Sequence, residues 1–261
     1  MKKKEPIPEQ PISLGPPWAK ASRSREDETL LRGPLSRLRD VGRAVRIFGE
    51  FLKGFTALSR IGPCVTVFGS ARFPEGHRWY RLAQEVGARI GEAGFTVMTG
   101  GGPGVMEAAN RGARSVGAPS IGCNIHLPHE QAANPFVDRF VEFHYFFVRK
   151  VMLVKYSRAF VVLPGGFGTL DELFETATLI QTAKIKDFPL VVMGVDYWGS
   201  ALEFVNKHMV AEGTISVDDA ERIVMTDSPE EAVEAILASS AAREGLKAPI
   251  APRVSQEGEG E

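Results

Sequence analysis

The stretch best suited to chemistry is a glycine turn between an apolar run and two carboxylates. Residues 159–163 (AFVVL) lead into Pro164 and a Gly-Gly-Phe-Gly segment, and Asp171 and Glu172 follow shortly after. A strand that turns through glycines into a helix directs backbone N–H groups and the positive end of the helix dipole at an anion. We expect Glu172 in the first turn of that helix. A carboxylate so close to a phosphate site would repel the ligand, which favours a chemical role for it.

A second glycine turn follows the apolar strand expected at residues 95–98. It has the sequence TGGGPG over residues 99–104, and a helical pattern occupies residues 105–113. Neither turn matches the dinucleotide fingerprint GxGxxG or the P-loop GxxxxGK[ST]. Each turn alone could be no more than a tight connection. Two such turns, each after an apolar strand, favour phosphate binding.

Charged side chains near these turns are the candidates for catalysis. Asp171 and Glu172 have Glu175 on near faces of the same expected helix, although acids at a helix start also simply favour its dipole. Arg149 and Lys150 interrupt an apolar helix expected over residues 145–156. They need a carboxylate, a phosphate or solvent as partners, or lie at the rim of the core.

A phosphate-binding loop with a carboxylate and an arginine suits cleavage at a sugar carbon. When a base leaves a ribose, positive charge develops at the anomeric carbon. A carboxylate can stabilise that charge or attack the carbon, as in glycoside hydrolysis. This chemistry requires no cofactor, and we expect the protein to contain neither a cofactor nor a metal ion.

The residues 164–172 (PGGFGTLDE), preceded by Arg149-Lys150, resemble the LONELY GUY family of cytokinin riboside 5′-monophosphate phosphoribohydrolases. Members are often labelled lysine decarboxylases, but nothing in this sequence resembles a pyridoxal phosphate site. The resemblance covers about residues 62–240. It implies a Rossmann-like sheet and a homodimer, or a larger multiple of dimers, with the active site at the dimer interface. Leu153 stands where short members often have Met, and short members lack the first 60 residues.

The resemblance also implies roles by position. Arg149 and Glu172 match the catalytic pair. The substrate-binding positions are Glu130, Lys150, Gly165, Gly166, Phe167, Gly168, Thr169, Leu170, Asp171 and Thr178. The second phosphate-side loop is Gly101, Gly102, Pro103 and Gly104.

The elements that would position these residues alternate from residue 61 onward. Strands are expected at residues 65–68, 95–98, 120–125, 140–143, 159–163, 190–193 and 223–225, and helices at 77–93, 105–113, 145–156, 172–183, 198–211 and 229–239. The alternation predicts an α/β fold, a doubly wound parallel sheet with helices on both faces. Ligands bind such sheets past the carboxyl ends of the strands. Gly69 and Ser70, Gly100 and Pro164 follow strands and can therefore line one crevice.

The flanking segments differ from this domain in composition. Residues 1–33 are predicted to be disordered, 34–60 to form an amphipathic helix, 61–240 to form the catalytic domain and 241–261 to be a flexible tail. The helix carries Leu38, Val41, Val45, Phe48, Phe51, Leu52 and Phe55 at helical spacing. We interpret it as docked on the domain or on a partner subunit. The alternative is a basic amphipathic helix lying on a membrane or nucleic acid.

Composition excludes several other classes. A net charge of −1 gives no general electrostatic case for nucleic acid, and no apolar run is long enough to span a membrane. Cys64 and Cys123 lie in apolar runs, so we expect no disulfide framework and a reducing cytoplasm. The spacing of His126, His129 and His144 is not that of a zinc motif. The main alternative is a non-catalytic nucleotide or molybdenum-cofactor carrier on the same fold, for which a carboxylate beside a phosphate would have no use.

Overall fold

The computed structural model describes residues 37–126 and 133–246. Some sequence predictions concern residues outside these ranges. They are the disorder of residues 1–33, the substrate contact of Glu130, and His129. In the described ranges, no helix has the length and apolar character to cross a membrane.

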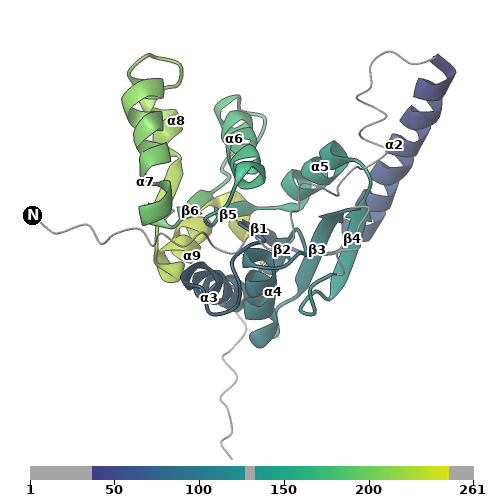
Figure 1. Ribbon diagram of the computed structural model, residues 1–261, viewed down its shortest axis with the longest axis horizontal. Coiled ribbons are helices and arrows are strands. Elements are labelled where there is room, and N and C mark those ends of the chain that lie inside the picture. The colour runs from purple at the N-terminus through teal and green to yellow at the C-terminus, as the bar shows by residue number, and fades with distance from the viewer. Residues whose placement is uncertain (1–36, 127–132, 247–261) are drawn as a thin grey trace, which may run out of the picture.

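A seven-stranded, all-parallel sheet forms the centre of the molecule (Figure 1). The strand order is β4-β3-β2-β1-β5-β6-β7. The strands are β1 (Cys64–Phe68), β2 (Thr96–Thr99), β3 (Ser120–Ile125), β4 (Arg139–Phe143), β5 (Ala159–Val162), β6 (Leu190–Met193) and β7 (Ile223–Thr226). The order runs outward in both directions from β1 and β5, so the chain reverses between these two strands. The predicted fold class is confirmed, and the carboxyl ends of β1 and β5 mark the expected ligand crevice.

Helices cover both faces of the sheet, because side chains alternate along buried strands. On one face, α3 (Arg78–Glu92), α4 (Val105–Ser115) and α9 (Pro229–Ala238) pack on Val65, Val67 and Val161. On the other, α5 (Phe146–Tyr156), α6 (Phe167–Gln181) and α7 (Val195–Phe204) pack on Phe68, Phe160 and Val162. Figure 1 shows the two layers on opposite sides of the strands.

Several helix boundaries differ from the sequence expectations. Helix α6 begins at Phe167 rather than near Glu172, because Gly166 is its N-cap and Gly168 is accommodated in the first turn. Glu172 therefore lies in the second turn, and the first turn contains no acid. Helix α7 also begins earlier and passes into a π-helical segment, η2 (Val205–Val210). The capping box of Ser216 and Asp219 starts a short helix that the apolar pattern did not predict, α8 (Val217–Glu221).

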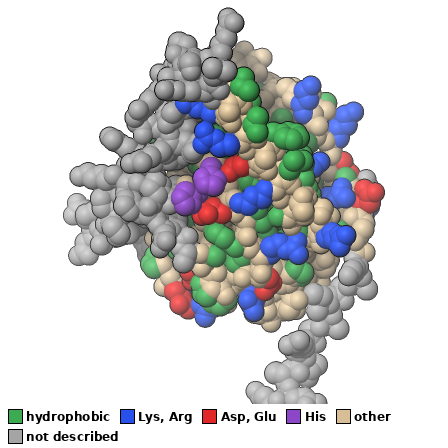
Figure 2. All heavy atoms as spheres, turned by 90° about the vertical axis from the view of Figure 1, so that its right-hand side faces the viewer, with side chains coloured by type: hydrophobic (Ala, Val, Ile, Leu, Met, Phe, Trp, Pro, Cys, Tyr) green, Lys and Arg blue, Asp and Glu red, His purple; other side chains and the backbone are tan. Residues whose placement is uncertain are grey.

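The segments at the two ends of the described chain pack on the domain. Helix α2 (Arg37–Leu58) runs along the β4 edge of the sheet and contacts α5, with Leu58 fully buried. Its opposite face leaves Val41, Val45, Phe48, Leu52 and Phe55 exposed, and Figure 2 shows hydrophobic side chains on this side of the molecule. After α9, helix α10 (Ser240–Arg243) buries Ala242 in the core. The expected flexible tail therefore does not begin at residue 241, because Ser239 caps α10 and binds the backbone of Asp187.

Candidate active site

A cavity of about 330 Å³ lies at the carboxyl ends of β1 and β5. Its lining combines the loop after β1, the start of α6 and side chains of α4 and α5. The residues are Phe68, Gly69, Ser70, Ala71, Arg72, Met106, Phe146, Arg149, Gly166, Gly168, Thr169 and Glu172. The sequence argument placed the crevice at this edge of the sheet. The structure brings Arg149 and Glu172 together there, with Gly166 and Gly168 of the first glycine turn and with Met106, which follows the second.

Arg149 of α5 and Glu172 of α6 form the polar centre of the cavity. Arg149 Nη2 donates to Glu172 Oε1 at 3.3 Å, and the guanidinium lies 4.6 Å from the centre of the Phe146 ring. The Glu172 residue is 2% exposed and the Arg149 side chain 16%. Within the described chain, Arg149 Nε and Glu172 Oε2 are buried and have no hydrogen-bond partner. Buried polar atoms normally do, so this pair keeps bonding capacity for a ligand.

Burial dominates the electrostatics of Glu172. Desolvation raises the pKa of this carboxyl above its ordinary range, while the charges of Arg149 and Lys150 act in the opposite direction. Glu175 adds to the upward shift. The helix dipole explanation does not apply, since Glu172 lies beyond the first turn of α6. Its placement costs solvation free energy, which is typical of a functional carboxylate rather than of a helix-stabilising one.

The glycine turn before α6 serves two purposes. A Cβ at Gly165 would lie 2.0 Å from Thr169 Oγ1, and Tyr197 donates its hydroxyl to the Gly165 carbonyl at 2.7 Å. Gly165 is thus required for close packing and is outside the cavity lining. Gly166 and Gly168 have open space where a Cβ would be, and both line the cavity. They leave the N-terminus of α6, with its unpaired backbone N–H groups, accessible to an anion.

The second glycine loop does not line the cavity but packs against the loop after β1. Gly101, Gly102, Pro103 and Gly104 are absent from the cavity lining, which Met106 of α4 reaches instead. Gly101 donates its N–H to Thr99 Oγ1 at 2.9 Å. Gly104 has a φ of 71°, and a Cβ there would lie 2.5 Å from the Ser70 carbonyl oxygen. The loop therefore fixes the position of Gly69 and Ser70, which do line the cavity.

Five of the expected substrate-binding residues lie on the other side of α6. Lys150, Phe167, Leu170, Asp171 and Thr178 border a separate, open hollow of about 750 Å³ with Phe147 and Phe174. Lys150 Nζ is 2.9 Å from Asp171 Oδ2 and also forms an ion pair with Glu175. Phe167 is 90% exposed. Within one chain, the residues expected at a single site thus divide between two surfaces.

Arg72, Met106 and Phe146 line the cavity but were not among the expected site residues. Arg72 had a signal in the sequence, since it follows β1 by four residues and so lies at the ligand-binding edge of a parallel sheet. Met106 and Phe146 are apolar residues in amphipathic helices, and nothing in their spacing distinguishes them from core positions. Leu153, one of the departures from the family pattern, is buried in the core rather than in the cavity.

Solved structures with this fold include molybdenum-cofactor proteins. A molybdenum cofactor binding protein from Rippkaea orientalis is 24% identical, with a TM-score of 0.53 over 68% of this chain and 96% of that protein. The molybdenum cofactor carrier protein of Chlamydomonas reinhardtii is 23% identical, with a TM-score of 0.51 over 68% of this chain and 98% of that protein. At this level of identity the likeness establishes the fold alone.

Sequence relatives are more specific. A family model described as "Possible lysine decarboxylase" matches residues 106–236. The cytokinin riboside 5′-monophosphate phosphoribohydrolase of Mycobacterium tuberculosis is 35% identical over 158 residues, which cover 59% of this chain and 83% of that enzyme. An enzyme of the same name from Arabidopsis thaliana is 44% identical over 87 residues, but the match spans only 40% of its length. These matches, over half of the chain and over most of the Mycobacterium tuberculosis enzyme, show that the chain belongs to the LONELY GUY family.

Proposed function

We propose that this protein hydrolyses the N-glycosidic bond of a nucleoside 5′-monophosphate, AMP or an N6-modified AMP. The products would be the free base and ribose 5-phosphate, a cytokinin-activating reaction when the base is a cytokinin. The names of the relatives support this activity. The observation that carries it is the buried pair of Arg149 and Glu172, which has unused bonding capacity inside a cavity at the N-terminus of α6.

The cavity has suitable groups for a 5′-phosphate. Gly166, Gly168 and Thr169 form the start of α6, where backbone N–H groups and the helix dipole favour an anion. Arg72 and Arg149 bring two cationic side chains to the same lining. The volume of about 330 Å³ is at the lower end of the range of small-molecule sites. With the phosphate at the α6 start, the ribose lies toward Glu172.

Glu172 then acts on the anomeric carbon. As the C–N bond breaks, its electron pair leaves with the base, which takes up a proton, and positive charge develops on the ribose. The Glu172 carboxylate stabilises that charge or attacks the carbon, and water finally supplies the hydroxyl group. Arg149 favours the ionised carboxylate by its charge and can bond the sugar or phosphate through Nε.

A pure carrier does not explain this arrangement. A buried carboxylate beside a bound phosphate weakens binding by charge repulsion, and burying it is costly by itself. A decarboxylase that uses pyridoxal phosphate needs a lysine of lowered pKa for its Schiff base. Burial acts to lower the pKa of Lys150, but hydrogen bonds to Glu175 and Asp171 raise it overall. Lys150 is therefore poorly suited to that chemistry.

We also propose that the chain acts as a homodimer, or a multiple of dimers, in a cytoplasmic setting. The outer faces of α5 and α6 expose Phe147, Val151, Phe167 and Phe174 around the open hollow. A contiguous group of exposed apolar side chains usually marks an interface. A second copy on this face would bring the residues around Lys150 close to a partner's cavity. That closure would reunite the expected substrate-binding residues that a single chain separates.

The activity is tested by incubating the purified protein with AMP and with N6-isopentenyl-AMP, followed by chromatography for the free base and an assay for ribose 5-phosphate. We expect both products in equal amounts. The Glu172→Gln variant, purified in the same way, controls for contaminating hydrolases. Nucleotide binding with no base release by the unaltered protein would support the carrier alternative instead.

A further inference from the structure

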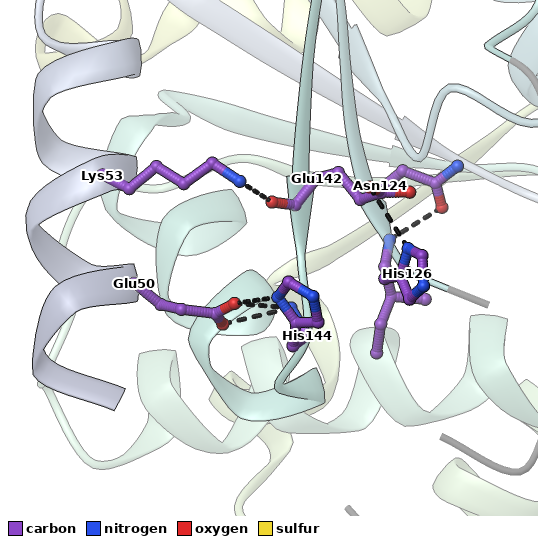
Figure 3. Close-up of polar contacts among 7 residues, drawn as sticks. Glu50, Lys53, Asn124, His126, Glu142 and His144 are labelled. Atoms are coloured by element: carbon purple, nitrogen blue, oxygen red, sulfur yellow. Dashed lines mark hydrogen bonds and ion pairs between the residues drawn. The ribbon is translucent and has the colours of Figure 1, made fainter. Parts of the chain in front are cut away.

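Glu50 of helix α2 inserts a buried carboxylate at the junction between β4 and α5 (Figure 3). The residue is 9% exposed. Its Oε1 accepts the His144 N–H at 2.8 Å and lies 2.6 Å from His144 Nδ1. Its Oε2 accepts the Tyr145 N–H at 3.2 Å. One side chain of the N-terminal helix thus binds three nitrogen atoms of two consecutive residues.

These two residues are the entry to the helix that carries Arg149. Tyr145 is the N-cap of α5, but its side chain makes no capping bond, and the first turn of α5 contains no acid. A helix start normally obtains an oxygen acceptor and a nearby negative charge from its own sequence. Here Glu50, 95 residues away in the chain, accepts the N–H of the N-cap residue Tyr145 and places an acidic side chain beside the helix start. The contact therefore stabilises the N-terminus of α5 in a way that α5 alone does not.

Arg149 lies one turn beyond this contact. Its N–H donates to the Tyr145 carbonyl at 3.3 Å, so its backbone is directly joined to the residue that Glu50 holds. Its guanidinium extends to Glu172 across the cavity. A shift at the start of α5 would move the guanidinium relative to the Glu172 carboxylate, and this contact is already at the long end of hydrogen-bond distances.

Other polar contacts surround the junction. Lys53 of α2 donates to the Glu142 carbonyl at 2.6 Å, and His126 Nδ1 lies 3.3 Å from Glu142 Oε2. The rings of His126 and His144 are 5.2 Å apart. Figure 2 shows a pair of histidine side chains together with acidic side chains beside them. Lys53 and Glu50 thus join α2 to the end of β4 and to the start of α5, respectively, and can be tested separately.

We propose that Glu50 is a positioning residue for the reaction, and that its carboxylate fixes the start of α5 and thereby the placement of Arg149 against Glu172. The kinetic consequence rests on the proposed function, whereas the structural one does not. On this basis, the N-terminal helix is part of the active-site support and not only a surface attachment.

The structural part is tested without substrate. Amide hydrogen exchange at His144 and Tyr145 and the NMR titration of the Glu172 carboxyl are compared in the unaltered full chain and in Glu50→Ala and Glu50→Gln. Two matched controls alter α2 elsewhere: Asp40→Asn removes its other described acid, which pairs with Arg43, and Lys53→Met removes the bond to β4. We expect faster exchange at both amides in Glu50→Ala, a smaller change in Glu50→Gln, and unchanged exchange there in the controls.

The Glu172 titration shows whether the effect reaches Arg149. The charges around this carboxyl are Arg149, Lys150 and Glu175. Displacing Arg149 removes the largest influence that favours the ionised form, so Glu172 should titrate at higher pH in Glu50→Ala. Its titration should be unchanged in Asp40→Asn. Faster exchange with an unchanged Glu172 titration would show that Glu50 only caps α5, and would overturn the proposal.

Turnover of AMP or N6-isopentenyl-AMP supplies the kinetic test. A displacement of about 1 Å can cost roughly a hundredfold in rate, and we expect kcat to fall in Glu50→Ala by about tenfold or more, with a smaller loss in Glu50→Gln. In an Arg149→Ala background, Glu50→Ala should cause no further loss, because residues that act as a unit are not additive. A full additional loss there would mean a general structural role. Absence of base release by the unaltered protein would instead refute the proposed function and leave the exchange result to stand alone.

Discussion

Lys150 and Asp171 form an ion pair, with Nζ and Oδ2 2.9 Å apart, directly beside the contact between Arg149 and Glu172. The two contacts join α5 to α6 at adjacent residues of each helix but point to opposite sides of α6. One faces the cavity, and the other faces the open hollow that we assign to the dimer interface. The contact between the two helices therefore holds Arg149 against Glu172 and also shapes the surface that we propose a partner subunit covers.

Replacing Glu172 by Gln should reduce turnover by roughly a hundredfold or more, the usual loss when one preorganised electrostatic group is removed. The near-isosteric amide can still accept a hydrogen bond from Arg149, so we expect the fold to survive. Turnover is measured from release of free base, and folding from circular dichroism and thermal unfolding. A folded variant with normal turnover on a confirmed substrate would remove Glu172 from the mechanism.

The alternation of strands and helices predicted the parallel sheet and the edge at which the cavity forms, because both follow from apolar periodicity and from the crossover geometry of parallel strands. The boundary of α6 was harder to predict. Glycines usually interrupt helices, yet Gly168 lies in the first turn of α6, where it lines the cavity. In the sequence, this glycine of the cavity lining therefore resembled a glycine at a helix boundary.

Contacts between distant segments could not be predicted from the sequence. Glu50 and Tyr145 are 95 positions apart, and nothing in the local pattern of α2 shows that one acid is buried while Asp40 is exposed. Similarly, Gly168 and Asp171 are three residues apart in α6 but border different surfaces. The direction of a side chain around a helix depends on where the helix begins, and that starting point was misplaced.

Two neighbouring glycines provide a matched test of the turn before α6. Gly165→Ala places a Cβ against Thr169 Oγ1 and should lower thermal stability together with activity. Gly168→Ala has open space for its methyl group, so the fold should be unchanged while the methyl group narrows the phosphate-binding end of the cavity. We expect a higher KM and normal unfolding for Gly168→Ala. Equal loss of stability in both variants would contradict this division of roles.

The phosphate should be essential for efficient reaction. If the start of α6, Arg72 and Arg149 hold the 5′-phosphate, adenosine loses binding energy that also supports the transition state. We expect kcat/KM for adenosine to be lower than for AMP by about a hundredfold or more. Arg72→Ala should reduce the preference by acting on AMP more than on adenosine. Similar kcat/KM values for the two substrates would show that the cavity does not recognise phosphate.

Assembly can be tested on two apolar surfaces separately. Phe174→Asp adds charge to the α5–α6 face, and Phe48→Asp adds charge to the exposed face of α2. Light scattering should show the unaltered protein at twice its 28.4 kDa chain mass or at a larger even multiple. Phe174→Asp should shift it toward the monomer and reduce turnover. If Phe48→Asp alone dissociates the assembly, α2 forms the primary interface; an active monomer of the unaltered protein would refute the shared site.

The raised pKa of Glu172 leads to a prediction for both rate and stability. The reaction needs the carboxylate, so kcat should fall as pH decreases through the pKa of Glu172, at a higher pH than for an ordinary glutamate. This acidic limb is read from the pH dependence of kcat, which reports groups in the enzyme–substrate complex. The pH dependence of kcat/KM is less suitable, because the phosphate of free AMP itself titrates near pH 6. Substituting Glu172 with Gln should remove that limb from any residual activity.

The sign of the stability effect follows from where the proton is held. Folded Glu172 keeps its proton to a higher pH than the unfolded chain does, so its contribution to stability is complete below the unfolded pKa and is lost as pH rises through the folded pKa. The free energy of unfolding of the unaltered protein should therefore decline across this window relative to that of Glu172→Gln, which has no such titration. Urea unfolding of both proteins at several pH values measures the difference. A difference that is independent of pH would show that burial does not shift this carboxyl.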